Sequence, residues 1–464
     1  MKKISLVVVA LLVISALSYL AWHTWGPSKP ENVVLIAIDT LRADHVSCYG
    51  YKDKTTPVLD NLASQGVRFA QCTSQAPWTL PSFSTIFTSL YPSQHGAQIN
   101  HKLRDLSKDA PRRLQGVVTL TKILKDHGLF TQAYASNPFT GYGIDDDFDQ
   151  FGWIGGSDSD EWAGNAHEIT DGGISFLNSN KRKPFFLYLH YNDVHEHHKI
   201  VPPPYTEQFT SKDLLEKLDG RTSAPYELIF PHVGFAMYDA RVTFCDNEIG
   251  RFIDALKEKG LWDKTLIMIL SDHGEEYYDH AKEEEQFGFD PRGFYGIGHG
   301  QSLYEELLNV VFILSGGQVP QGKVIQGPSR LLDVMPTVLD LMGIQTNVHM
   351  EGVSLKSAME TGRIEDRPVF SEGIAYGYDK KAVRFHEWKY IFSFYNNFEE
   401  LFNLEKDPKE KHNLINEEKE RAKFLRKQLV SFMEKGNEES FSQEGEQQID
   451  NDVKKRLQDL GYLN

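Results

Sequence analysis

The chain has 464 residues, which is enough for two or three domains and for a large hydrophobic core. Hydrophobic residues make up 40% of the sequence and charged residues 25%, an ordinary globular composition that excludes a disordered or fibrous protein. With 49 Lys and Arg against 65 Asp and Glu, the formal net charge is −16, which argues against nucleic acid as a partner. Three cysteines, Cys48, Cys72 and Cys245, exclude a disulfide-rich scaffold and leave one bridge possible.

An uncharged apolar run near the amino terminus predicts export. Two lysines precede it, and residues 4–22 contain no charged side chain, a length that suits one bilayer-spanning helix. Because the lysines are expected to stay in the cytoplasm, the rest of the chain is predicted to face the periplasm or the cell exterior. Residues 1–25 fit a membrane-spanning signal anchor, and a cleaved signal peptide is the alternative.

Three apolar runs rich in branched and aromatic residues predict buried parallel strands, at Asn32–Ile38, Pro184–Tyr191 and Thr265–Leu270. Helical patterns separate them, at residues 57–66, 114–128, 164–178 and 238–260. Strands that alternate with helices are typical of a doubly wound α/β fold with a mostly parallel sheet. We therefore expect one catalytic domain over residues 32–364.

The pattern changes beyond residue 365. Short aromatic strands between residues 383 and 404 and a charged helix from about Glu417 to Lys435 predict a small antiparallel sheet with a covering helix. We assign residues 365–435 to this carboxyl-terminal subdomain. Residues 436–464 are polar and acidic, and we expect a partly disordered tail.

Acidic residues and histidines follow the ends of the three predicted strands. The carboxyl ends of neighbouring parallel strands share one edge of the sheet, where ligands bind, so these side chains can converge on a divalent cation. A single Asp after a strand is more often only a helix cap, and the hypothesis depends on several such positions occurring together. Two candidate ligand sets result: Asp39, Asp272 and His273, and Asp193, His195 and His299.

A threonine stands at the start of another helical pattern. Thr79 is expected to be the N-cap of a helix, with Pro81 in its first turn. A role as the helix cap would by itself explain why a threonine occurs at this position. The same position also places a hydroxyl among unpaired N–H groups at the positive end of a helix, which favours an alkoxide and an anionic ester. Contact with a metal ion would lower the pKa of this hydroxyl and make it a nucleophile at neutral pH.

The ordered motifs resemble the sulfatase branch of the alkaline phosphatase superfamily. The resemblance extends from Asn32 to about Lys435, and it implies the α/β fold of that family and a metal-dependent hydrolase of esters. The motifs that carry it are, in chain order, Ile38–Asp44, Cys48–Tyr51, Trp78–Ser82, Leu90–Gly96, Asp193–His195, Ser271–Glu275, Gly298–Glu305, Leu332–Thr337 and Glu400–Leu404.

Several departures from the family pattern change the expected mechanism. Sulfatases of this branch usually carry a Cys or Ser that is oxidised to formylglycine, followed by an Arg, whereas Thr79 and Phe83 occupy these positions here. Oxidation of Thr would give a ketone in place of the required aldehyde, so we expect the formylglycine route to be closed. Thr40 replaces an Asp ligand and His273 replaces an Asn, which shifts the expected metal from calcium, still possible, towards zinc or manganese.

The resemblance to superfamily members that use a metal-bound Thr implies roles for the candidate residues. One metal ion would be held by Asp39, Thr79, Asp272 and His273. The other set, Asp193, His195 and His299, would hold a second ion or contact the ester oxygens. With one ion, His195 or His299 would protonate the leaving group. His197 is an alternative to His195 as the ligand from that loop, and is otherwise expected to bind substrate. Trp78 is either the floor of a substrate pocket or a packed aromatic residue.

Our leading hypothesis is a hydrolase of small-molecule, lipid or glycan esters of phosphate or sulfate that acts through a covalent Thr79 intermediate, with phosphate favoured. Three alternatives remain: a sulfuric ester hydrolase, a transferase of phospho-substituents between envelope lipids or glycans, and a degenerate, non-catalytic binding module. The related transferases typically have several membrane helices and this sequence has one apolar run, which weighs against transfer.

Overall fold

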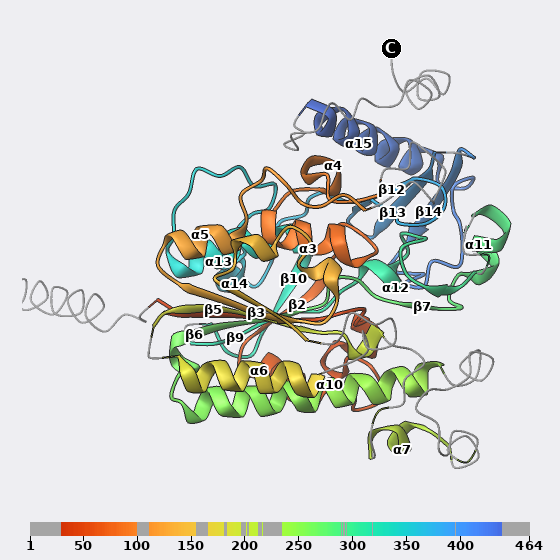
Figure 1. Cartoon of the computed structure of the whole chain (residues 1–464). Coiled ribbons are helices and arrows are strands. Elements are labelled where there is room, and N and C mark those ends of the chain that lie inside the picture. The colour runs from red at the N-terminus through yellow and green to blue at the C-terminus, as the bar shows by residue number, and fades with distance from the viewer. Residues whose placement is uncertain are drawn as a thin grey trace, which may run out of the picture.

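The computed structural model describes residues 29–99, 111–154, 166–180, 183–195, 201, 204–211, 216, 234–288, 290, 293, 295–317, 319–394 and 396–438 (Figure 1). The predicted amino-terminal anchor, His197 and residues 439–464 of the predicted tail lie outside these ranges. Within them, no helix is both long enough and apolar enough to cross a membrane. All three cysteines are free thiols.

An eight-stranded sheet forms the centre of the catalytic domain. Its strands are β1 (Asn32–Ile38), β2 (Val67–Thr73), β3 (Phe130–Ala135), β4 (Gln150–Trp153), β5 (Phe185–Tyr191), β6 (Thr265–Leu270), β9 (Phe312–Gly316) and β10 (Lys323–Arg330). They lie in the order β10-β2-β9-β6-β1-β5-β3-β4. β9 runs antiparallel to both of its neighbours, and the other pairs are parallel. The mostly parallel sheet predicted from the sequence is confirmed.

The strands closest to the site are buried on both faces. Every residue of β1, β5 and β6 is buried, as expected for continuous apolar runs in a parallel sheet. β1 pairs with β5 on one side and with β6 on the other, so that Ile36 lies between Leu189 and Ile269. The predicted bounds of β1 and β6 are confirmed. β5 begins one residue later than predicted, after Pro184, which has no N–H group to pair.

Helices cover both faces of the sheet (Figure 1). One face carries α3 (Thr79–Thr88), α5 (Leu120–Asp126), α13 (Val334–Met342) and α14 (Lys356–Thr361). The other face carries α2 (Pro57–Ser64), α6 (Ala166–Ser179) and α10 (Gly234–Glu258). Each face has its own hydrophobic core, so the doubly wound fold is confirmed. α5 begins six residues later than predicted, because the Thr119 side chain accepts a hydrogen bond from the Lys122 N–H and caps the helix there.

The carboxyl-terminal subdomain is a four-stranded antiparallel sheet covered by one long helix. The strands β11 (Val369–Ser371), β12 (Lys380–Phe385), β13 (Trp388–Ser393) and β14 (Phe398–Asn403) pair in sequence order. Tyr390 and Leu401 of this sheet pack against Leu425 and Leu429 of α15 (Lys419–Glu438). The predicted sheet and covering helix are confirmed, and the helix continues three residues into the segment predicted to be a tail.

Shorter elements connect these layers. They are the 3-10 helices η4 (Pro138–Thr140) and η6 (Asp193–His195), the helices α4 (Pro92–His95), α7 (Tyr205–Phe209), α11 (Ala281–Phe287) and α12 (Glu305–Leu308), and the hairpin of β7 (Glu276–Tyr277) and β8 (Ile297–Gly298).

A buried ion-pair network joins the subdomain to the catalytic domain. The Lys389 ammonium on β13 lies 3.0 Å from a carboxylate oxygen of Glu305 and 2.9 Å from one of Glu410. The side chain of Lys389 is 2% exposed and that of Glu410 is 0% exposed. A buried ion pair stabilises the interface only while both charges are present, because a single charge left without water and without a partner is destabilising.

We therefore predict that Lys389→Ala lowers the free energy of unfolding by about 3–5 kcal/mol, because it removes the cation from buried Glu410. Urea denaturation followed by fluorescence measures this change. The control is Lys356→Ala, which removes a pair with Asp340 whose side chains are 48% and 43% exposed. An exposed pair contributes about 0–1 kcal/mol, so equal effects of the two variants would contradict the prediction.

Candidate active site

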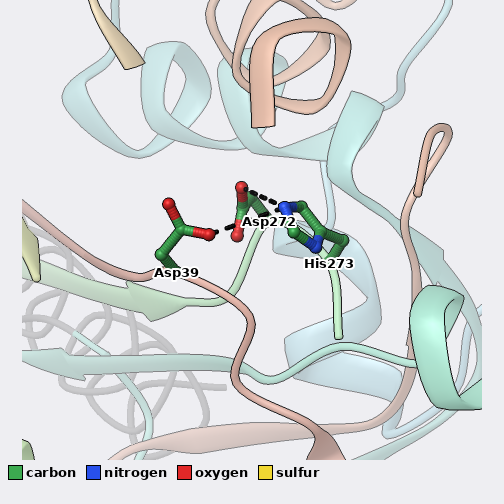
Figure 2. A group of neighbouring side chains, drawn as sticks. All are labelled: Asp39, Asp272 and His273. Carbon is green, nitrogen blue, oxygen red and sulfur yellow. Dashed lines mark ion pairs between the residues drawn. The ribbon is translucent and has the colours of Figure 1, made fainter. Parts of the chain in front are cut away.

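Three side chains converge where β1 and β6 end. Asp39 directly follows β1, and Asp272 and His273 follow β6 after one residue. Because the two strands are parallel neighbours, both reach the same edge of the sheet. One ligand atom of each residue lies within 4.8 Å of those of the other two, and all three residues are 0% exposed. Figure 2 shows the two carboxylates and the imidazole pointing toward one another.

The donor atoms of this group fit a divalent cation. Asp39 Oδ1 and Asp272 Oδ2 are buried and have no hydrogen-bond partner. They lie 3.5 Å and 3.2 Å from His273 Nε2. His273 Nδ1 is 2.9 Å from the Gly274 carbonyl oxygen, and a proton donated there leaves the Nε2 lone pair directed at the carboxylates. Two carboxylates and an imidazole in this arrangement match the ligands of divalent metal ions.

Burial and the charges of neighbouring side chains set the protonation states of Asp39, Asp272 and His273. Burial by itself raises the pKa of Asp39, but the attraction of His190, His195 and His273 brings it below its usual value. Burial and then the charge of Asp39 raise the pKa of Asp272. Burial by itself lowers the pKa of His273, but the attraction of Asp272 and Asp39 raises it to about 9. A cation that binds here at neutral pH must therefore displace a proton from His273.

Thr79 lies next to this group. α3 begins at Thr79 itself, and Trp78, with φ −159° and ψ 164°, occupies the N-cap position. The prediction that Thr79 is the N-cap is therefore wrong by one residue. The helix starts there because the Trp78 carbonyl accepts the N–H of Ser82. The Thr79 hydroxyl is thus not used in capping, and its Oγ1 lies 3.3 Å from His273 Nε2.

Phe83 packs beneath the site, one turn of α3 beyond Thr79. It is 0% exposed, and its ring meets the His190 ring edge-on with 5.2 Å between centroids. His190 Nε2 lies in turn 3.4 Å from Asp39 Oδ2. The position that carries an Arg in the family pattern is therefore occupied by an apolar ring in the core.

Two residues that hold Asp39 were missed in the sequence. Asn137 Nδ2 donates a hydrogen bond of 3.0 Å to Asp39 Oδ2, the oxygen that also faces His190. His190 is a polar residue inside the apolar run of β5, and this position in the sequence was a signal that it has a role near the site. Asn137 follows β3, a strand that the sequence analysis did not predict. These contacts leave Asp39 Oδ1 as the oxygen that faces His273.

The turn after β1 is held in an unusual conformation. Thr40 has φ +57°, in the left-handed region that a β-branched residue rarely adopts. Its N–H is 3.3 Å from Asp272 Oδ1, and its carbonyl accepts a 2.7 Å hydrogen bond from the Tyr238 hydroxyl. Strain of this kind persists only where surrounding contacts fix it, and here it orients the two aspartates. Arg42, bonded to Asp44 and Asp279, braces the same loop.

Two further histidines adjoin the group. The His299 ring lies 4.5 Å from the His273 ring and 4.9 Å from the His195 ring, measured between centroids. His299 Nδ1 is 3.2 Å from a carboxylate oxygen of Glu275, whose side chain is 0% exposed, whereas the His299 side chain is 18% exposed. A carboxylate that orients a partly exposed imidazole is a common arrangement for proton transfer. Glu275 was part of a recognised motif, but its pairing with His299 was not predicted.

Asp193 lies apart from the other candidate ligands. It is 3% exposed, and its carboxyl group accepts a hydrogen bond from the Ala166 backbone at the start of α6 and faces Arg241 of α10. Burial raises its pKa to about 7. The turn of η6 thus directs Asp193 toward the helix layer. Of the second predicted ligand set, the structure brings together His195 and His299 and leaves Asp193 outside.

Trp78 is packed and not open to solvent. It is 5% exposed, its Nε1 donates a 2.6 Å hydrogen bond to the Gly373 carbonyl, and its ring meets Phe139 edge-on. The packed alternative for Trp78 matches this placement better than the floor of a pocket. His197, the other predicted substrate-binding residue, lies outside the described residues.

Comparison with known proteins identifies the family. Residues 31–344, more than half of the sequence, match the family model named Sulfatase. The chain belongs to the sulfatase family. Residues 293–439 match the model of the N-sulphoglucosamine sulphohydrolase carboxyl-terminal region. An arylsulfatase of Clostridium perfringens is 26% identical over 480 residues, which cover 89% of this chain and 96% of that protein.

Solved structures share the fold of this sulfatase-family protein. One, determined in complex with D-glucosamine-2-N,6-O-disulfate, superimposes with a TM-score of 0.69 at 18% identity and covers 90% of this chain and all of its own. The phosphonate monoester hydrolase of Agrobacterium radiobacter superimposes with a TM-score of 0.66 at 18% identity, covering 88% of this chain and 96% of its own.

A matched set of Asp→Asn variants tests which carboxylates bind metal. We predict that Asp39→Asn and Asp272→Asn each weaken binding of a divalent ion at least tenfold, because an amide oxygen carries no charge to offset that of the ion. Asp193→Asn, an equally buried control, should leave binding unchanged. Competition with a metallochromic indicator measures the affinity. Equal losses in all three variants would contradict the assignment.

Proposed function

We propose that the protein is a metal-dependent hydrolase of phosphate esters with Thr79 as its nucleophile. The observation that carries the proposal is the 3.3 Å distance between Thr79 Oγ1 and His273 Nε2, within a buried group that fits a divalent cation. Membership of the sulfatase family supports ester hydrolysis in general. The choice of phosphate and of Thr79 rests on the residues of this chain.

The position of Thr79 suits attack on an anionic ester. It opens α3, a helix of ten residues whose first N–H groups and positive end favour negative charge. A bound divalent cation would lower the pKa of the Thr79 hydroxyl and offset charge on the ester oxygens. Zinc or manganese fits two carboxylates and an imidazole better than calcium, which prefers a larger set of oxygen ligands.

The remaining steps use His299. Thr79 would attack as the alkoxide, after its hydroxyl has lost a proton to solvent. As Thr79 Oγ1 forms a bond to phosphorus, the bond to the leaving oxygen breaks and His299 gives that oxygen a proton. Glu275 holds the Nδ1 side of the ring, and Nε2 is the nitrogen that would exchange the proton with substrate. His299 then takes a proton from the water that attacks the phosphothreonine, the bond between phosphorus and Thr79 Oγ1 breaks to restore the alkoxide, and inorganic phosphate leaves. In this scheme His299 acts first as an acid and then as a base, and His195 lies against it.

Phosphate is favoured over sulfate because Thr79 carries a single hydroxyl. The hydrated aldehyde of formylglycine has two hydroxyls and can expel sulfate by elimination, a path that Thr79 lacks. Similarity in fold to a phosphonate monoester hydrolase supports chemistry at phosphorus on this scaffold. Sulfate ester hydrolysis is the second candidate, favoured by the arylsulfatase relative.

We further propose that the substrate is a small-molecule, lipid or glycan ester outside the cytoplasm. Solved structures of similar fold have D-glucosamine-2-N,6-O-disulfate and a neocarrahexaose as ligands, which supports glycan esters as one class. The uncharged run at residues 4–22 supports export and attachment to a membrane.

We predict that Thr79→Ala lowers kcat/KM for 4-nitrophenyl phosphate by a factor on the order of 10³ or more, because it removes the hydroxyl that forms the covalent intermediate. Thr79→Ser keeps a hydroxyl and should retain measurable activity. Thr88→Ala, at the other end of α3, serves as the control. The assay compares 4-nitrophenyl phosphate, bis(4-nitrophenyl) phosphate and 4-nitrophenyl sulfate with added zinc, manganese or calcium. Unchanged turnover by Thr79→Ala would refute the mechanism, and a clear preference for sulfate would favour the second candidate.

The role of His299 predicts a dependence on the leaving group. In His299→Ala, kcat/KM for an alkyl phosphate should fall by about 10²–10⁴, because an alkoxide needs a proton to leave. The loss for 4-nitrophenyl phosphate should be much smaller, since nitrophenolate leaves without one. His349→Ala, at a histidine whose side chain is 47% exposed, is the control. An equal loss for both substrates would argue against proton donation by His299.

A further inference from the structure

A segment of the carboxyl-terminal subdomain is bonded to residues that flank the candidate site. Residues 372–379 connect β11 to β12, and they leave β11 beside the turn that leads to α3. The Ser371 hydroxyl donates a 2.7 Å hydrogen bond to the Ser74 carbonyl, and the Glu372 N–H donates one of 2.9 Å to the Gln75 carbonyl. The segment therefore enters along the residues that precede Thr79.

The next residue of this segment is bonded to the neighbour of Thr79. The Gly373 carbonyl accepts the 2.6 Å hydrogen bond from Trp78 Nε1. Trp78 itself is buried, so this contact is shielded from water and fixes the segment against the start of α3.

The segment is also bonded to the neighbour of His299. The N–H groups of Ala375 and Tyr376 donate hydrogen bonds of 2.7 Å and 3.0 Å to the Gly300 carbonyl. A Cβ atom at Gly300 would lie 2.9 Å from the Ala375 side chain and 3.3 Å from the Tyr376 ring. A glycine is therefore required for this close approach. Residues 373–376 span the distance between the flanks of Thr79 and His299.

Tyr376 is the first side chain of this span that reaches solvent. Ile374 and Ala375 are buried, and Tyr376 is half-buried. Its ring lies against Gly300 and packs on the hydrophobic cluster that contains Trp78 and Phe83. An aromatic ring that lies against Gly300, the residue after the proposed acid His299, offers a flat apolar surface to the group that carries the ester.

We propose that Tyr376 is a specificity-determining residue that packs against a six-membered ring, of a sugar or an aryl group, attached to the ester oxygen. This inference rests on the proposed function for the position of the ester and goes beyond it in naming the group that carries it. Aromatic side chains bind six-membered rings more strongly than small alkyl groups, because the buried apolar area is larger. The carboxyl-terminal subdomain thereby forms part of the substrate pocket.

Binding of non-hydrolysable phosphonates tests the inference without turnover. Isothermal calorimetry on the manganese-loaded protein compares phenylphosphonate, cyclohexylphosphonate and methylphosphonate. We expect Tyr376→Ala to weaken the two ring-bearing ligands about tenfold, a factor that corresponds to ~1.4 kcal/mol, and to leave methylphosphonate unchanged. Tyr376→Phe should keep the preference for the ring-bearing phosphonates over methylphosphonate. The ratio of phenyl to cyclohexyl affinity distinguishes an aryl from a sugar-like ring.

Phe424→Ala, at a residue of α15 that is 43% exposed, is the control within the same subdomain and should change no affinity. Equal losses for all three phosphonates, or no loss for any, would overturn the role of Tyr376 and leave the Thr79 mechanism standing. Wild-type protein that binds no phosphonate would contradict the phosphoester site and this inference with it.

Discussion

Two buried carboxylates at the ends of adjacent strands are the constraint on which the site depends. Asp39 and Asp272 are both 0% exposed, and like charges without water repel each other strongly. The protein offsets this repulsion with His273 on one side and with His190 and Asn137 on the other. A divalent cation would complete the balance, because one oxygen of each carboxylate lacks a hydrogen-bond partner. The same charges that the fold must balance are therefore the ones that make this group suitable for a divalent ion.

The other functional groups approach this pair from separate parts of the chain. α3 brings Thr79 from one helix layer, and Gly298 at the end of β8 leads directly into His299. The segment that follows β11 bonds to the residues beside both. Because each group is held by backbone hydrogen bonds or buried packing, the site is preorganised and does not depend on mobile side chains. The carboxyl-terminal subdomain therefore contributes to the site as well as to stability.

The fold and the chemistry of this protein are separable. The chain has the sulfatase fold, yet the residue that opens α3 is Thr79, and the ring of Phe83 fills the core one turn later. An arginine at residue 83 would have to displace the Phe83–His190 contact, so the apolar ring is built into the support of Asp39. Function is determined by such local substitutions on a shared scaffold.

The sequence by itself determined the mostly parallel α/β fold class, the central strands β1, β5 and β6 and the subdomain, because continuous apolar runs and helical periodicity are local properties of the chain. It also placed Asp39 and Asp272 at one edge, since parallel strands end together. Only the tertiary structure decided that Asp193 turns toward α6, that Asn137 and Glu275 support the site, and that Trp78 precedes the helix in place of Thr79. Side-chain direction in a loop depends on contacts with residues far away in the sequence, and no local pattern carries that information.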